Sequence, residues 1–149
     1  MILFYCRYMD GRIRLVIVDD HKLMRETWKM ILQRDPRIEV IAECTSGEEA
    51  IQCAEKEIPD VMLMDINMAP VNGFEATRKI AKAHPEIRII GLSINNLPTY
   101  ARNLMQMGAK GYVTKNSSAA EMLEAIVTVF SGGTYICKEV RNQMPPKGH

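Results

Sequence analysis

Two short apolar runs in this chain each lead directly into aspartate. Residues 15–18 (Leu-Val-Ile-Val) precede Asp19 and Asp20, and residues 61–64 (Val-Met-Leu-Met) precede Asp65. A strand inside a parallel sheet is apolar on both faces, so charge first appears where the strand emerges at its carboxyl end. Open α/β sheets bind their ligands at this edge. The three carboxylates therefore predict a site at the carboxyl edge of a parallel sheet.

Two later runs end in polar residues of other kinds. Residues 87–92 lead to Ser93, and residues 111–114 lead to Lys115. If these runs are neighbouring strands of the same sheet, their ends add a hydroxyl and an ammonium group to the three carboxylates.

Helical segments alternate with the expected strands. Apolar residues at helical spacing, capping residues, and Pro or Gly near the ends indicate where each helix begins and ends. The expected helices cover residues 21–34, 47–57, 73–83, 97–107 and 118–130, and a further strand covers residues 38–44. Alternating strands and helices joined by right-handed crossovers predict a parallel sheet with helices on both faces. The expected fold is a three-layer α/β/α sandwich with five parallel strands.

Length and charge limit the range of functions. The chain has 149 residues, enough for one domain with one core. Its 19 Lys and Arg and 18 Asp and Glu leave a formal charge of +1, which provides no general attraction to nucleic acid or to an anionic membrane. We expect residues 1–12 to form an N-terminal extension, residues 13–133 the main domain, and residues 134–149 a polar tail or the start of a linker.

Neither the cysteines nor the N-terminus indicates export. The four cysteines lack the close CxxC spacing of a zinc or redox site, which favours free thiols in a reducing cytoplasm. The apolar stretch over residues 1–6 is far shorter than the ~20 residues that cross a bilayer. We therefore expect a cytoplasmic protein with no signal peptide and no membrane anchor.

Three carboxylates in one place repel one another unless one is protonated or a cation binds among them. Mg²⁺ suits such a site because it prefers oxygen ligands and retains some of its waters. Calcium needs more oxygens, and zinc is disfavoured because His21 is the only imidazole nearby. Asp65 stands alone at its strand end and is the candidate nucleophile toward phosphorus. Lys115 and Ser93 are candidates to contact the oxygens of the phosphoryl group.

The motifs in this order resemble the receiver domain of bacterial two-component response regulators, over about residues 13–133. They are Val-Asp-Asp-His at 18–21, Met-Asp-Ile-Asn-Met at 64–68, Asn-Gly at 72–73, Leu-Ser at 92–93 and Gly-Ala-Lys-Gly-Tyr-Val-Thr-Lys at 108–115. Each motif is weak alone, but the ordered set is specific. The resemblance implies a flavodoxin-like sheet with strand order 2-1-3-4-5. Within the family, the chain is most similar to LuxR-type and NarL-type receivers.

The resemblance also implies roles at the acidic site. Asp65 would be the phosphoacceptor. Asp20 would bind Mg²⁺ directly, Asp19 would assist through water, and the backbone carbonyl of Asn67 would complete the protein's share of the metal ligands.

A second group of residues would carry the switch. The resemblance implies that Ser93 is the switch hydroxyl, that Tyr112 is an aromatic residue that turns inward, and that Lys115 is the basic partner of the phosphoryl group. The output would be a change in the surface of the fourth helix, fifth strand and fifth helix, which includes Tyr100, Leu104 and Tyr112.

The implied partner is a sensor histidine kinase, and homodimers are expected in such a family. The chain would act as a switch and not as a turnover enzyme. Its parent protein would be a transcriptional regulator, but this chain has no helix-turn-helix segment and should not bind specific DNA alone.

Departures from the family pattern leave alternatives open. The loop after the acceptor has Ala69 where the family usually has proline, and Pro70 follows it. A misplaced Asp65 would make the chain a degenerate receiver that acts only in protein interactions. A phosphohydrolase with an aspartyl intermediate is a further alternative, although it usually needs an acid where Asn67 stands. Ile94, in place of a small residue, predicts slow attack by water on the phosphorylated form.

Overall fold

The computed structural model describes residues 11–68 and 72–145. Within these residues six strands form one parallel sheet in the order β2-β1-β3-β4-β5-β6. The strands are β1 (Ile13–Val18), β2 (Ile38–Cys44), β3 (Val61–Asp65), β4 (Arg88–Ser93), β5 (Gly111–Thr114) and β6 (Tyr135–Ile136). The helices are α2 (Lys22–Gln33), α3 (Gly47–Glu57), α4 (Gly73–Ala83), α5 (Pro98–Gln106), α6 (Ala119–Phe130) and α7 (Lys138–Arg141).

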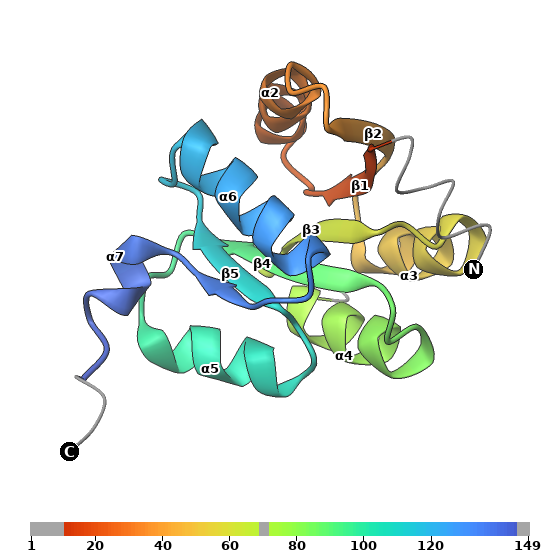
Figure 1. The fold of residues 1–149 in the computed structure, drawn as a ribbon. Coiled ribbons are helices and arrows are strands. Elements are labelled where there is room, and N and C mark those ends of the chain that lie inside the picture. Colours follow the sequence, from red (N-terminus) through yellow and green to blue (C-terminus); the bar gives the residue numbers. More distant parts are fainter. Residues whose placement is uncertain (1–10, 69–71, 146–149) are drawn as a thin grey trace.

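The helices form a layer on each face of the sheet. Figure 1 shows α2 and α6 on one face, with α3, α4 and α5 on the other. This arrangement confirms the predicted three-layer α/β/α sandwich and the order of its first five strands. In the part of the chain that the structure describes, no helix is both long and apolar enough to span a membrane.

Local capping explains why three of the helices begin where they do. Ser46, Asn72 and Ser118 each have extended backbone, and each side chain accepts a hydrogen bond from the backbone N–H three residues later. Such bonds satisfy donors that the first turn of a helix leaves free. The five predicted helices agree with the structure to within one residue at each end.

Strands β1 and β3 form the centre of the core. Leu15 and Ile17 pack in the layer that contains α2 and α6, whereas Val16 and Val18 pack in the layer that contains α3 and α4. All residues of β3 are buried. Because side chains alternate between faces along a strand, apolar residues are needed at every position until the strand ends. The polar residues that follow are therefore presented together at the carboxyl edge.

The sheet is wider than the sequence predicted. The segment 134–149, expected to be a tail, contains β6 and α7 in its described part. Strand β6 pairs with β5 through Gly111 with Tyr135 and Tyr112 with Ile136. Cys137 and Val140 are fully buried. The segment therefore packs onto the domain as far as α7.

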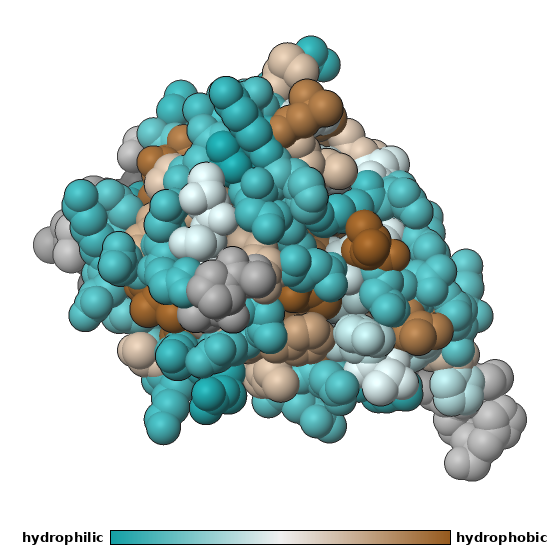
Figure 2. Space-filling view, turned by 180° about the vertical axis from the view of Figure 1, so that it is seen from behind, coloured by the Kyte–Doolittle hydropathy of each residue, from teal (hydrophilic) through white to brown (hydrophobic). Residues whose placement is uncertain are grey.

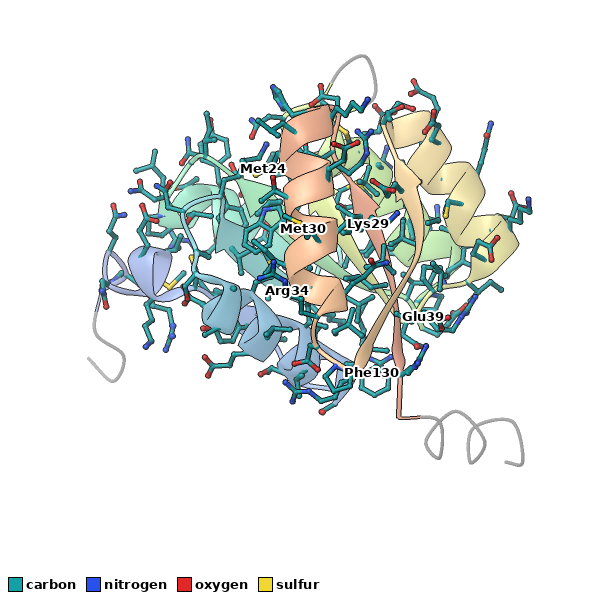
Figure 3. The ribbon with its side chains drawn as sticks, turned by 90° about the horizontal axis from the view of Figure 1, so that it is seen from above. Met24, Lys29, Met30, Arg34, Glu39 and Phe130 are labelled. Atoms are coloured by element: carbon teal, nitrogen blue, oxygen red, sulfur yellow. The ribbon has the colours of Figure 1, made fainter. Side chains whose placement is uncertain are left out.

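Helix α2 is fixed at the opposite edge of the sheet. In Figure 3 it crosses the sheet beside β2, with Lys29 on the side toward β2. The Lys29 ammonium lies 3.0 Å from a carboxylate oxygen of Glu43, and the Arg25 guanidinium lies 3.3 Å from the other. Arg25 also donates a hydrogen bond of 2.8 Å to the backbone carbonyl of Asp19. Helix α2 is thus tied to the end of β1, where the acidic residues lie.

Candidate functional site

Three acidic residues predicted to meet at the sheet edge lie together. Oxygens of Asp19, Asp20 and Asp65 and a nitrogen of His21 all lie within 4.8 Å of one another. Asp19 and Asp65 are fully buried, while the Asp20 side chain is 40% exposed. Strands β1 and β3 are neighbours in the sheet, so their carboxyl ends bring these residues to one place.

Lys115 is the cation in this cluster. Its ammonium lies 3.3 Å from Asp65 Oδ2 and 3.4 Å from Asp19 Oδ2, and its side chain is only 9% exposed. Its backbone N–H donates 2.8 Å to the carbonyl of Ser93, which fixes the end of β5 beside the end of β4. One ammonium therefore faces two buried carboxylates, and the second negative charge is not fully balanced.

The environment of Asp65 makes its ionised form less stable than in water. Burial raises the pKa of Asp65 above its ordinary value of 3.8, and the Asp19 carboxylate raises it further. The Asn67 N–H, which donates to Asp65 Oδ1 at 3.0 Å, and the Lys115 ammonium both lower this pKa but do not cancel the effect of burial. An additional positive charge at this place would stabilise the carboxylate.

The donor atoms suit Mg²⁺. Asp19 Oδ2 is buried and accepts no hydrogen bond from the described residues, so it has an unused lone pair next to the Asp65 and Asp20 carboxylates. Hard oxygen ligands of this kind are those that Mg²⁺ prefers. Asn67, whose backbone carbonyl was predicted to be a ligand, follows Asp65 by two residues and is tied to it by its N–H. That carbonyl's role as a ligand stays a prediction.

A glycine keeps the acceptor loop close to the helix that follows it. A Cβ atom at Gly73, the first residue of α4, would overlap the carbonyl oxygen of Asp65 and the Cα of Ile66. Only glycine permits this approach without a shift of the backbone. The Asn-Gly pair of the sequence motif therefore has a steric role directly behind Asp65. Ala69 and Pro70, the departures noted in this loop, lie outside the described residues.

Ser93 faces the acceptor loop from β4. Its hydroxyl donates to Asn67 Oδ1 at 3.3 Å and accepts from the backbone N–H of Asn95 at 2.9 Å. Ser93 is fully buried, whereas Ile94 beside it is 75% exposed. The long bond to Asn67 is the weaker of the two contacts, so the hydroxyl can exchange this acceptor for an oxygen bound at Asp65.

Tyr112 is fully buried in the structure. Its hydroxyl donates a short hydrogen bond of 2.6 Å to the carbonyl of Asn95, and burial raises its pKa above the ordinary value of 10.0. The structure thus contains the inward position of Tyr112, and its movement stays a prediction. Asn95 joins Tyr112 to Ser93 but was not among the predicted site residues, because nothing in a loop asparagine marks it out by sequence alone.

The predicted interaction surface needs correction. Leu104 and Tyr112 are fully buried, so of the three named residues only Tyr100 is exposed, at 38%. Leu104 faces the sheet because Gly91 leaves room for it, as a Cβ atom at Gly91 would collide with its side chain. Figure 2, seen from behind the view of Figure 1, shows apolar groups as separate patches among hydrophilic ones.

His21, expected from the sequence to be the only imidazole near the acidic residues, lies beside them. Its Nδ1 lies 3.3 Å from Asp19 Oδ1 and 3.1 Å from Asp20 Oδ1. The ring is 69% exposed at the mouth of the cluster. Its position next to two aspartates in the sequence was the available signal.

Comparison with known proteins agrees with this geometry. The response regulator receiver domain family matches residues 15–127. The chain belongs to this family. The receiver is 42% identical over 135 residues to the transcriptional regulatory protein DegU of Brevibacillus brevis, covering 91% of this chain and 57% of DegU. It is 38% identical over 135 residues to the response regulator GacA of Pseudomonas viridiflava, covering 91% of this chain and 63% of GacA.

A solved structure shares both the fold and the class. The crystal structure of a LuxR-family two-component response regulator from Aurantimonas sp. SI85-9A1 superposes with a TM-score of 0.85 at 30% identity, covering 89% of this chain and 94% of that one. The receiver spans about three fifths of the length of the two curated relatives. It is a receiver domain of a two-component response regulator with relatives of the LuxR and NarL type.

Proposed function

We propose that this receiver accepts a phosphoryl group on Asp65 from a sensor histidine kinase, in the presence of Mg²⁺. The observation that carries the proposal is the buried pair of carboxylates, Asp19 and Asp65, held 3.3–3.4 Å from the single ammonium of Lys115. This arrangement leaves excess negative charge for a metal ion and provides a cation for an incoming phosphoryl group.

The residues of the site have separate roles in this reaction. An oxygen of Asp65 forms a bond to phosphorus while the phosphorus–nitrogen bond of the kinase's phosphohistidine breaks, and the imidazole leaves with the electron pair and takes up a proton. Lys115 then contacts one phosphoryl oxygen, and the Ser93 hydroxyl donates to another. Asp19, Asp20, Asp65 and the Asn67 carbonyl would hold Mg²⁺, which supplies positive charge that offsets the charge of the phosphoryl oxygens.

The reaction makes the receiver a switch and not a turnover enzyme, because the chain itself is the substrate. Rotation of the Ser93 hydroxyl toward the phosphoryl group would change its bond with the Asn95 N–H, and through Asn95 the contact with Tyr112. Tyr100 lies on the exposed side of α5, beside this loop. We propose that the surface of α5, β5 and α6 changes in response and that it can serve in homodimers.

The process in which the receiver takes part is also a proposal. DegU, a relative named as a transcriptional regulatory protein, is longer than this chain. We propose that the receiver operates within transcriptional control. Specific DNA binding is not expected from the chain of 149 residues alone, and a sequence-specific gel shift with it would contradict this expectation.

Intact mass spectrometry tests phosphorylation. After incubation with acetyl phosphate and Mg²⁺, the wild-type chain should gain about 80 Da, the mass expected when a phosphoryl group replaces a proton. Asp65→Ala should gain nothing, whereas Glu55→Gln, which removes an exposed acid on α3, should gain as much as wild type. An equal gain in Asp65→Ala would place the acceptor elsewhere.

A second measurement separates a working receiver from a degenerate one. Binding of Mg²⁺ with beryllofluoride, a mimic of the phosphoryl group, should change the fluorescence of the tyrosines or of Trp28, which is buried in α2. A chain that neither gains mass within seconds of mixing nor responds to the mimic would act only as a protein-interaction module.

A further inference from the structure

The segment formed by β6 and α7 docks at the end of β5. The backbone N–H of Cys137 donates 3.0 Å to the carbonyl of Tyr112. Val140 of α7 is fully buried, and Tyr135 is 8% exposed. The Tyr135 hydroxyl and the Lys138 N–H both donate to one carboxylate oxygen of Glu121 in α6, at 2.9 Å and 2.8 Å. The α7 end of the segment is therefore held against both β5 and α6.

Glu139 of α7 joins two elements next to the acceptor site. One oxygen of its carboxylate accepts a hydrogen bond of 2.8 Å from the Thr114 hydroxyl, and the other accepts one of 2.8 Å from Asn96 Nδ2. The side chain of Gln143 donates 3.0 Å to the backbone carbonyl of Asn96. Asn96 is thus held at both its side chain and its backbone. These bonds lower the pKa of Glu139, Asn96 having the larger effect and Thr114 the smaller.

Both partners of Glu139 lie next to residues assigned to the switch. Thr114 immediately precedes Lys115, whose ammonium contacts Asp65. Asn96 follows Ser93 by three residues. Between them Asn95 donates its N–H to Ser93 and accepts a hydrogen bond from Tyr112. Hydrogen bonds, together with the peptide links between Asn95 and Asn96 and between Thr114 and Lys115, therefore connect the acceptor region with α7.

The docked arrangement favours one position of the Ser93 loop. With Glu139 bound to Thr114 and Asn96, the Ser93 hydroxyl points toward Asn67, whose N–H holds the Asp65 carboxylate. Lys115 is held against Asp65 at the same time. The docked form thus presents both groups that would contact a phosphoryl group. A form with α7 released loses two restraints on these groups.

We propose that Glu139 is a positioning residue that couples the docking of α7 to phosphorylation of Asp65. Docked α7 stabilises the phosphorylated state, and by thermodynamic reciprocity the phosphorylated state holds α7 more tightly. Helix α7 is thereby an output element in addition to the α5 and β5 surface. The inference rests on the proposed phosphoacceptor role of Asp65 and adds a route from that residue to the C-terminal segment.

Amide hydrogen exchange tests the coupling in the full chain. The reporters are the amides of Arg141 and Asn142, which donate to the carbonyls of Cys137 and Lys138 within α7. Saturating Mg²⁺ and beryllofluoride should slow their exchange about tenfold in wild type, a change typical of coupled sites. The same addition should leave these amides unchanged in Glu139→Ala. The amide of Ala50, which donates to Ser46 at the start of α3, is the internal control.

A second variant tests the same contact in case Glu139→Ala fails to fold. Thr114→Val keeps the shape of a buried side chain but removes one of the two donors to Glu139. With Mg²⁺ and beryllofluoride bound, the α7 amides of Thr114→Val should exchange faster than those of wild type and more slowly than those of Glu139→Ala. In the reciprocal measurement, Glu139→Ala should bind beryllofluoride about tenfold more weakly than wild type.

The outcomes separate this inference from the proposed function. If wild type binds the mimic and the exchange of α7 does not change, the coupling is absent and the phosphoacceptor role stands. If Glu139→Ala shows the same protection and affinity as wild type, Glu139 is not the coupling residue. A chain that does not bind the mimic at all overturns both proposals.

Discussion

Replacing Asp65 by asparagine should make the receiver more stable when Mg²⁺ is absent. The substitution removes one of the buried carboxylates and leaves Lys115 paired with Asp19, 3.4 Å away. An asparagine oxygen can still accept the Asn67 N–H. The amide nitrogen can donate to Asp19 Oδ2, which accepts no hydrogen bond from the described residues.

The magnitude follows from the charges around Asp65. Its attraction to Lys115 at 3.3 Å is worth about 5 kcal/mol at an effective dielectric constant of about 20. The repulsion from Asp19, at a separation of no more than 4.8 Å, is at least about 3.5 kcal/mol on the same scale, and the half-exposed Asp20 adds a smaller, screened amount. These terms nearly cancel, so the desolvation of the carboxylate decides the sign. We expect a gain of roughly 1–3 kcal/mol, because an amide is less costly to bury than a carboxylate.

Urea denaturation at neutral pH, with EDTA or with excess Mg²⁺, measures this difference. Mg²⁺ should stabilise wild type more than Asp65→Asn, because the variant has lost one ligand, so the advantage of the variant should shrink or reverse. Glu55→Gln, an exposed acid on α3, is the matched control and should change stability by less than about 0.5 kcal/mol in either buffer. An Asn variant that is no more stable than wild type in EDTA would refute the reasoning.

The pH dependence has a defined sign. The pKa of Asp65 is raised in the folded state above its ordinary value of 3.8, mainly by burial. The folded state therefore binds the proton more tightly than the unfolded state does. The contribution of Asp65 to the free energy of unfolding falls as pH rises from 3.8 through the raised pKa. The advantage of Asp65→Asn in EDTA should appear over that range and be absent below it.

Three further substitutions test other parts of the site. Lys115→Met should lower the free energy of unfolding in EDTA by roughly 3–5 kcal/mol, because it leaves two buried carboxylates without their cation; a urea titration showing less than about 1 kcal/mol would contradict this. Gly73→Ala should lower the free energy of unfolding by roughly 1–3 kcal/mol, because its Cβ would overlap the backbone of Asp65 and Ile66. The same overlap should reduce the mass gain with acetyl phosphate. An unchanged mass gain would mean that α4 can shift away without disturbing Asp65. Ile94→Ala should speed the loss of the phosphoryl mass, and an unchanged lifetime would show that Ile94 does not limit attack by water.

Much of the fold and of the acidic site could be predicted because the signals are local. Three of the helices begin at a capping side chain, as at Ser46 and Ser118, and strand β3 is an apolar run up to Asp65. Parallel strands place their carboxyl ends at one edge of the sheet, so Asp19, Asp65 and Lys115 could be brought together without knowledge of any single contact.

The prediction of the interaction surface was less accurate because an apolar residue on a helix can belong either to the core or to an exposed contact surface. Leu104 and Tyr100 both belong to α5, but Leu104 is fully buried over Gly91 and Tyr100 is 38% exposed. Helical periodicity identifies an apolar face but does not state how far around the helix the core extends. That limit depends on the neighbouring strand, and here on one glycine in β4.

The contacts of α7 could not be predicted at all, for a related physical reason. Strand β6 has only two residues, too few for a periodic signal, and Glu139 is one of 18 acidic residues in the chain. Its two partners lie 25 and 43 positions away in the sequence. The position of a polar residue at a strand end follows from the sheet alone. A side-chain bridge such as that of Glu139 forms only if particular residues of separate segments come into contact. The acceptor site is therefore readable from sequence, while the connection that would carry its state to the C-terminal segment depends on tertiary contacts.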